Sequence, residues 1–319
     1  MPTFGTLHGR RSERSQALTA STEEDLLSCV LRRIGLRGHV YARPQVCGDW
    51  QFSTGERAQA SYHLMTQGSG FLHMRHLSTP LAVAPGDLMF FPRDSWHAVS
   101  ARPLLEAGGE LRLPEAGGPT TRLVCGIYHG DDIEFRRLMQ GLPDLILLRM
   151  SESGTALEPV VRMLADEDAH DRPARGVLLD ALSDVLLALV LRQALANGHL
   201  QAGLLMALGD ARIGPVLAAL HAEPGRDWTL DTLAGVAALS RSRLTERFRE
   251  LLDCSPLQYL AELRMREATV QLRIGQLSVA QIAERLGYAT ETAFRRAYKR
   301  VTGLTPGGAR RTSSATGAQ

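Results

Sequence analysis

Two stretches decide the fold of the C-terminal third: residues 228–272, WTLDTLAGVAALSRSRLTERFRELLDCSPLQYLAELRMREATVQL, and residues 279–311, VAQIAERLGYATETAFRRAYKRVTGLTPGGARR. They repeat one pattern, first at an offset of 49 residues and, after a one-residue difference in the turn, at an offset of 50. The matching positions are Leu233 and Ala234 with Ile282 and Ala283, Leu244 with Phe294, Phe248 with Tyr298, and Ser255 and Pro256 with Thr305 and Pro306. Each copy has the apolar spacing of a helix, a tight turn and a second helix.

Capping residues mark where these helices begin. Ser240 and Thr290 can cap the second helix of each copy, and Ser278 starts a capping box. Pro256 fits the first position of a long helix that joins the copies. We therefore expect residues 205–311 to form an all-helical domain with two helix-turn-helix motifs.

The second helix of each copy has a polar stripe at equivalent positions. Two such helices suit insertion into successive major grooves about one turn, roughly 34 Å, apart. Arginine can donate two hydrogen bonds to guanine, and glutamate can accept a hydrogen bond from cytosine. The backbone amides at the start of a helix can bind phosphate. The predicted DNA-binding set is Ser240, Ser242, Thr245, Glu246 and Arg249 in the first copy and Thr290, Glu291, Thr292, Arg295, Arg296 and Lys299 in the second. The plainer alternative is a helical bundle with solvated charged faces.

The distribution of charge favours DNA binding over that alternative. The net charge of the chain is +2, but residues 205–311 carry 16 basic and 11 acidic residues, while residues 1–204 carry 20 and 23. A basic domain on a nearly neutral chain indicates an anionic partner for that domain.

Length and composition limit the class of protein. The 319 residues suffice for two domains, and 44% hydrophobic with 22% charged residues is typical of a folded protein. The longest aliphatic run, residues 185–191, is far shorter than the roughly 20 residues of a membrane helix. The polar N-terminus does not resemble a signal peptide, so we expect a cytoplasmic protein without a membrane partner. Four widely spaced cysteines argue against a disulfide framework or zinc ribbon: Cys29, Cys47, Cys125 and Cys254.

The N-terminal half has short apolar runs between turns: HVYA, SYHLM, GFLHM, LAV, DLMFF, HAVS and RLVCGIY. Their alternation predicts an antiparallel β-barrel or sandwich, interrupted by a long Gly/Pro-rich loop over residues 102–121. Helical spacing follows in residues 159–168 and 173–197. The expected fold class is α+β, divided into an N-terminal tail (1–24), a sensor barrel (25–155), a helical linker and dimerisation segment (156–204), the helical domain (205–311) and a disordered tail (312–319).

The repeated stretches resemble the DNA-binding domain of AraC/XylS-type transcriptional regulators. Asp253 and Cys254 replace the usual Gly-x of the first copy, so Asp253 stands in place of the glycine, and Ala309 replaces an aromatic residue. In the N-terminal half, GDLMFFPRDSWH at residues 86–97 resembles the second cupin motif, with Asp94 in place of its glycine. The resemblance implies a cupin-type barrel that senses a signal, a regulator that is not an enzyme, and RNA polymerase as a partner. The resemblance also favours an activator of transcription over a repressor.

His63 and His97 are candidate metal ligands in the barrel, because neutral imidazoles bind zinc, copper, nickel or iron. A cupin enzyme is also expected to have a His-x-His pair and a glutamate, and YHLMTQGSGFLHMRH has neither. Further possible ligands are His73, His76, Cys125 and His129. Hydrogen-bonded core histidines are the alternative, and a metal-dependent cupin enzyme with a helical appendage is the rival function.

Two other signals remain open for the barrel. A small organic effector could be lined by Tyr62, Met65, Phe90 and Trp96. A redox signal could act on Cys47, which lies in a loop near Arg43, or on Cys29 or Cys125. In either case we expect residues 159–197 to pass the signal on across a homodimer interface.

Overall fold

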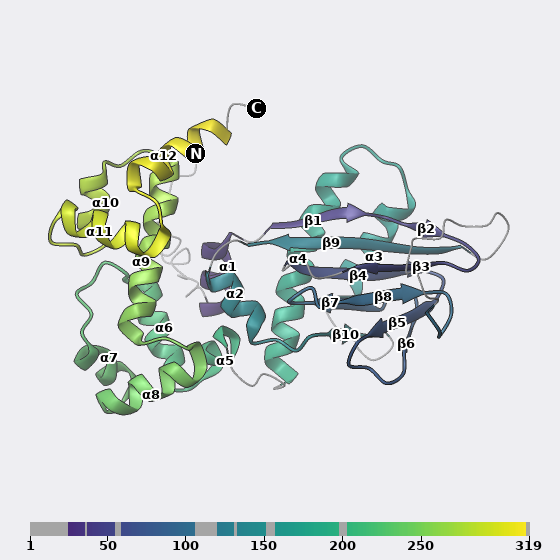
Figure 1. Cartoon of the computed structure of the whole chain (residues 1–319), viewed down its shortest axis with the longest axis horizontal. Coiled ribbons are helices and arrows are strands. Elements are labelled where there is room, and N and C mark those ends of the chain that lie inside the picture. The colour runs from purple at the N-terminus through teal and green to yellow at the C-terminus, as the bar shows by residue number, and fades with distance from the viewer. Residues whose placement is uncertain are drawn as a thin grey trace, which may run out of the picture.

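The computed structural model describes residues 25–35, 37–54, 59–105, 120–130, 133–150, 157–197 and 203–316. Strands dominate the N-terminal half and helices make up the C-terminal half, which lies on the left in Figure 1. The expected N-terminal tail and most of the long loop after residue 102 lie outside the described residues. Within those residues, no helix is both long enough and apolar enough to span a membrane.

The N-terminal half contains two antiparallel sheets. The larger sheet has the order β1 (Arg37–Ala42), β9 (Thr121–His129), β4 (Ala60–Gln67), β7 (Leu88–Phe91) and β10 (Ile146–Leu148), with β2 (Gln45–Val46) also on β9. The smaller sheet has the order β3 (Gln51–Thr54), β8 (His97–Ser100), β5 (Gly70–Met74) and β6 (Leu81–Val83). All seven apolar runs lie on strands, whereas β2, β3 and β10 were not predicted.

The expected closed barrel is wrong, because both sheets end in open edges. At the β1 edge a helix takes the place of another strand. On α4, the Asp184 carboxylate accepts from the Gly38 amide at 2.6 Å, and the Asp180 carboxylate accepts from the Val40 amide at 2.9 Å. These carboxylates satisfy edge amides that would otherwise need a strand partner.

Helices α3 (Leu157–Ala169) and α4 (Arg175–Asn197) pack together on the larger sheet, close to the predicted helical segments. Helices α1 (Leu26–Ile34) and α2 (Ile133–Gln140) were not predicted. The last three residues of the apolar run LPDLILL, residues 142–148, form strand β10 on β7. A short apolar run can pair as a buried strand as readily as it can form a helical turn.

The N-terminal half has two separate cores, because successive side chains of a strand point to opposite faces of the sheet. Tyr62 and Leu64 belong to the core against the helices, whereas Met65, the next residue, packs in the core between the sheets. The first core continues through the helices of the C-terminal half as far as Leu263. The boundary expected at residue 205 stays a prediction, and buried packing runs across it.

The C-terminal half has helices α5 (Leu204–Gly209), α6 (Ile213–Ala222), α7 (Leu230–Ala237), α8 (Arg241–Leu252), α9 (Pro256–Ile274), α10 (Val279–Arg285), α11 (Glu291–Thr302) and α12 (Pro306–Thr316). Helices α8 and α11 have the same length and are offset by 50 residues at both ends. The Ser240 and Thr290 caps and the capping box of Ser278 are confirmed. Helix α12 ends at Thr316, so it extends into the residues predicted as a tail.

Candidate DNA interface and sensor sites

Helices α8 and α11 are held by matching apolar side chains. Leu244 and Phe248 of α8 are buried, as are Phe294 and Tyr298 of α11. Because residues three and four apart share one side of a helix, the opposite side carries the predicted polar stripe. Each stripe therefore faces away from the core on a helix with a defined start.

On α8, Ser242, Glu246 and Arg249 are exposed. Thr245 is half-buried, and its hydroxyl donates to the Arg241 carbonyl at 2.9 Å. The Glu246 carboxylate accepts from the Arg243 guanidinium at 3.0 Å, a pair that would have to open before Glu246 could accept from a base. Ser242 and Arg249 need no such rearrangement of an ion pair.

On α11, Thr292, Arg295, Arg296 and Lys299 are exposed. Glu291 accepts from the Arg295 Nε at 2.6 Å, so this arginine is already partly neutralised. Within the described part of the chain, Arg296 and Lys299 have no ion pair. Arg296 and Lys299 of the predicted stripe are therefore available to an anion without the opening of an ion pair.

The capping hydroxyls have a defined role in the fold. Ser240 accepts from the amide of Arg243 at 3.3 Å, and Thr290 accepts from the amide of Ala293 at 3.1 Å. A hydroxyl that accepts in this way can still donate its proton. Ser240 and Thr290 can therefore cap their helices and donate to a phosphate at the same time.

The four residues expected to line an effector site do not face a common space. Tyr62 and Phe90 are buried in the core against the helices, and the Tyr62 hydroxyl lies 2.5 Å from the Ser183 hydroxyl of α4. Met65 is buried between the sheets. Trp96 is half-buried, with the Arg75 guanidinium over its ring.

The structure does bring His63 and His97 together, between the sheets, with their Nε2 atoms 2.8 Å apart. The Thr54 hydroxyl lies 3.3 Å from the Nε2 atom of His63 and 2.7 Å from that of His97. His97 Nδ1 donates to the Ser95 carbonyl at 2.7 Å, which leaves its Nε2 as an acceptor. Burial lowers the pKa of both imidazoles, and for His63 the nearby His97 adds to the effect, so both are neutral at pH 7.

Two neutral imidazoles are suitable ligands but too few for a metal centre, since zinc sites use three or four protein ligands. Among the described residues, no group of three His, Cys, Asp or Glu side chains could hold a metal ion. His73 instead lies 2.7 Å from the Ser100 hydroxyl, and His129 is exposed at the end of β9. The described residues do not fit a metal centre, and the pair is a hydrogen-bonded core contact.

The cysteines differ in accessibility. Cys125 is fully buried between the sheets, and burial raises the pKa of its thiol well above the usual range. Burial also raises the pKa of Cys254, to about 11. Cys29 and Cys47 are half-buried, and the Cys47 sulfur lies 3.6 Å from the Thr120 hydroxyl. Because the thiolate is the reactive form, Cys125 is poorly suited to redox sensing.

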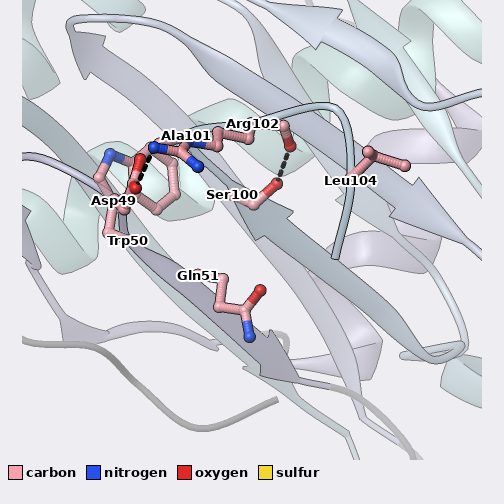
Figure 2. A pocket seen from close by; sticks show the side chains of 7 residues that line it. All are labelled: Asp49, Trp50, Gln51, Ser100, Ala101, Arg102 and Leu104. Atoms are coloured by element: carbon pink, nitrogen blue, oxygen red, sulfur yellow. Dashed lines mark hydrogen bonds and ion pairs between the residues drawn. The ribbon is translucent and has the colours of Figure 1, made fainter. Parts of the chain in front are cut away.

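The two cavities described next are not lined by the four residues predicted to form an effector site. The hollow in Figure 2 lies beside β3 and β8, where the Arg102 guanidinium pairs with Asp49 and the Ser100 hydroxyl donates to the Arg102 carbonyl at 2.6 Å. Its volume of about 20 Å³ suits one water rather than an effector. A cleft of about 610 Å³ lies between residues 137–144 of the N-terminal half and the end of α8, at residues 250–253.

A buried polar network joins the two halves near this cleft, and sequence reasoning missed it. The Tyr259 hydroxyl of α9 donates to Glu134 of α2 at 2.9 Å, and it accepts from His221 Nε2 of α6 at 2.8 Å. Arg266 of α9 pairs with the other Glu134 oxygen, and Arg137 of α2 pairs with Glu262 of α9 at 2.5 Å. The only signal in the sequence was polar residues at inward positions of the long helix.

Comparison with known proteins gives the class of the molecule. The family profile described as Cupin matches residues 25–196, and the profile described as Helix-turn-helix domain matches residues 233–312. The regulator MtrA of Neisseria gonorrhoeae is 28% identical over 297 residues, covering 89% of this chain and 97% of the relative. A putative AraC-like regulator of Streptomyces lividans is 28% identical over 294 residues, with the same coverage. The RCS-specific activator RclR of Escherichia coli is 27% identical over 288 residues, covering 89% of this chain and 96% of the relative.

These matches cover both halves of the chain and agree with the two-part fold. The chain belongs to the cupin family through its N-terminal half and, with its C-terminal helix-turn-helix domain, is a transcriptional regulator of the AraC type.

Proposed function

We propose that the protein binds double-stranded DNA at a specific site and reads two elements of that site, one with α8 and one with α11. The observation that carries the proposal is the matched pair of capped helices, whose apolar sides are buried and whose polar sides are exposed at an offset of 50 residues. In this proposal α7–α8 and α10–α11 are both helix-turn-helix motifs. Elements one helical turn apart then fit two successive major grooves.

The two helices are proposed to contribute unequally. On α11, Arg296 and Lys299 are exposed without an ion pair in the described part of the chain, so they reach DNA at little cost. On α8, Arg249 has the same freedom, whereas Glu246 must first leave Arg243. We assign base contacts to Arg296 and Arg249, and phosphate contacts to Lys299, Ser240 and Thr290.

Selection of genomic fragments by the purified protein, at roughly physiological salt, tests this proposal. A specific protein favours its site over scrambled DNA by about 10³–10⁷. Enrichment of two elements about one turn apart supports the proposal. Equal binding to every sequence, with a steep loss of affinity in salt, contradicts it, because that behaviour belongs to phosphate contacts alone.

The N-terminal half is proposed to control DNA binding in response to an effector. Its core is continuous with the helices that carry α8, and Glu134 is bonded to α9, so a change in the cupin fold can reach the DNA-binding half directly. The cleft of about 610 Å³ at this junction is within the size range of small-molecule sites. The E. coli relative is named an activator, which supports activation through RNA polymerase.

The protein is further proposed to act as a homodimer through the outer face of α3 and α4. Val177, Val185 and Met163 are 72%, 46% and 55% exposed on these helices. A monomer gains nothing from exposing these apolar side chains, whereas a second copy of the chain would bury them. Sedimentation of the full chain at micromolar concentration should give a dimer mass, and Val185→Glu should give a monomer. A monomeric wild-type protein would remove the proposal.

A further inference from the structure

The long helix α9 passes from one core to another at a single residue. Leu263 belongs to the core that the first helix pair, α7 and α8, shares with the N-terminal half. Met265 belongs to a separate core built around the second helix pair, α10 and α11. Arg264 lies between them, half-buried on α9. The second pair is therefore a separate packing unit carried by this helix.

The Arg264 guanidinium contacts both units at this junction. Its Nε donates to the Pro224 carbonyl at 2.7 Å and its Nη2 donates to the Arg226 carbonyl at 2.8 Å, both in the loop before α7. The same guanidinium lies over the ring of Tyr288, 5.6 Å from the ring centre, in the turn between α10 and α11. A planar fork that donates twice and also stacks is a property of arginine that lysine lacks.

The backbones of the two units also touch beside this side chain. A Cβ atom on Gly287 would overlap the carbonyl oxygen of Gly225, and a Cβ atom on Gly225 would overlap the carbonyl oxygen of Arg285. Gly287 also has a φ of +74°, which disfavours other residues. This approach fixes the loop before α7 against the turn before α11.

Next to this contact the two units are separated by a cleft. Its volume is about 560 Å³, and its lining includes Glu223, Arg226, Gln271 and Arg285. Because side chains do not fill this space, the angle between the units depends on α9, on the backbone approach of Gly225 and Gly287, and on the contacts of Arg264.

We propose that Arg264 is a spacing-determining residue: by tying the loop before α7 to the turn before α11, it fixes the distance and rotation between α8 and α11. The inference rests on the proposed function, because it needs both helices to read DNA. One added base pair moves the second element by about 3.4 Å and turns it by roughly 35°. A rigid pair of helices can therefore fit only one spacing of the two DNA elements.

The test uses the selected site and variants of it in which one or two base pairs are inserted between, or removed from, the two elements. Binding of the full-length protein is measured on each. The wild-type protein should lose at least about tenfold in affinity for each one-base-pair change, comparable to the loss of one base contact. Arg264→Ala should bind the best site a few-fold more weakly, and its preference among spacings should fall by roughly tenfold.

Arg264→Lys keeps the charge but not the planar guanidinium that donates two hydrogen bonds. Its preference among spacings should therefore also fall, but by less than in Arg264→Ala. Arg273→Ala, which removes an exposed charge from the same helix, is the matched control and should keep the wild-type spacing profile. If Arg264→Ala does not fold, as judged by circular dichroism, Arg264→Lys provides the comparison.

The outcomes separate the two proposals. If the wild-type protein selects no two-element site, the proposed function fails. If it selects one with a fixed spacing and both folded Arg264 variants keep that spacing profile, the proposed function stands and the role of Arg264 is overturned. A uniform loss of affinity at every spacing also overturns it, because such a loss reflects only charge or stability.

Discussion

Tyr259 and Glu134 form a buried hydrogen bond of 2.9 Å that crosses from the DNA-binding half to the cupin half, although 125 residues separate them in sequence. Burial, together with the Glu134 carboxylate, raises the pKa of the Tyr259 hydroxyl, so the phenol keeps its proton and remains a donor. Arg266 pairs with the same carboxylate. Breaking a buried network of this kind is costly because charged or polar groups are left without partners.

This geometry predicts energetic coupling between the two halves. Tyr259→Phe should lower the free energy of unfolding by about 1–3 kcal/mol and Glu134→Gln by about 3–5 kcal/mol, since the latter leaves Arg266 buried without its anion. The double variant should lose less than the sum of the two. Urea denaturation of the full chain measures all three. Pairing Tyr259→Phe with Glu284→Gln, an exposed position on α10, is the control and should give additive losses.

The exposed cations of α11 make a second prediction about DNA binding. Arg296→Ala should lose about 1–3 kcal/mol on the specific site and relax the base preference at one position. Arg295→Ala should lose less, because Glu291 already partly neutralises that guanidinium. Affinity is measured for both variants on the selected site and on scrambled DNA. An equal loss on the two DNAs would show that Arg296 contacts only phosphate.

Local signals explain why the C-terminal half was well predicted from its sequence. Ser240, Thr290 and Ser278 act on amides three residues away, so each helix start is written in a few neighbouring residues. The departure from the family pattern at Asp253 also has a local explanation. Asp253 has a φ of 54°, and Gly303, 50 residues later, has a φ of 75°, so both occupy the left-handed position that ends a helix.

The N-terminal half was predicted less well because its contacts are between distant residues. Alternation located the strands, but it could not show that Asp180 and Asp184 would cover the edge of β1 in place of another strand. It also could not show that Tyr62 and Met65 would face different cores. The Glu134 network is of the same kind, since its members lie on three helices.

The buried histidines give a prediction about pH. In the folded protein the pKa values of His63 and His97 lie below their ordinary value, whereas in the unfolded chain they return to about 6.5. Above pH 7 both states are neutral and the pair contributes no pH dependence. As the pH falls through about 6.5, the unfolded chain takes up protons that the folded protein does not, so stability decreases by at most about 1.4 kcal/mol per pH unit for each histidine.

Urea denaturation between pH 7.5 and pH 5.0 measures this slope. His63→Gln should make it shallower by up to about 1.4 kcal/mol per pH unit. His129→Gln, at an exposed position at the end of β9, is the control and should leave the slope close to that of the wild-type protein. An unchanged slope in His63→Gln would mean that His63 takes up its proton in the folded state.

Two aspartates in left-handed backbone make the last prediction, because the same substitution should have opposite effects. Asp253 has a φ of 54° at the end of α8, and Asp94 has a φ of 49° in the cupin motif. A left-handed conformation costs most residues roughly 1–2 kcal/mol and glycine very little. Asp253→Gly should therefore raise the free energy of unfolding by up to about 1 kcal/mol.

Asp94 is different because it is buried and its carboxylate accepts from the Ser61 hydroxyl at 2.7 Å. Asp94→Gly relieves the same backbone cost but leaves that buried hydroxyl without its acceptor, at about 1–3 kcal/mol. We expect a net loss of stability, and Ser61→Ala in the Asp94→Gly background should recover part of it, because the stranded donor is then removed. Chemical denaturation of the three variants checks the signs. A stabilised Asp94→Gly would show that backbone strain at this position outweighs the hydrogen bond to Ser61.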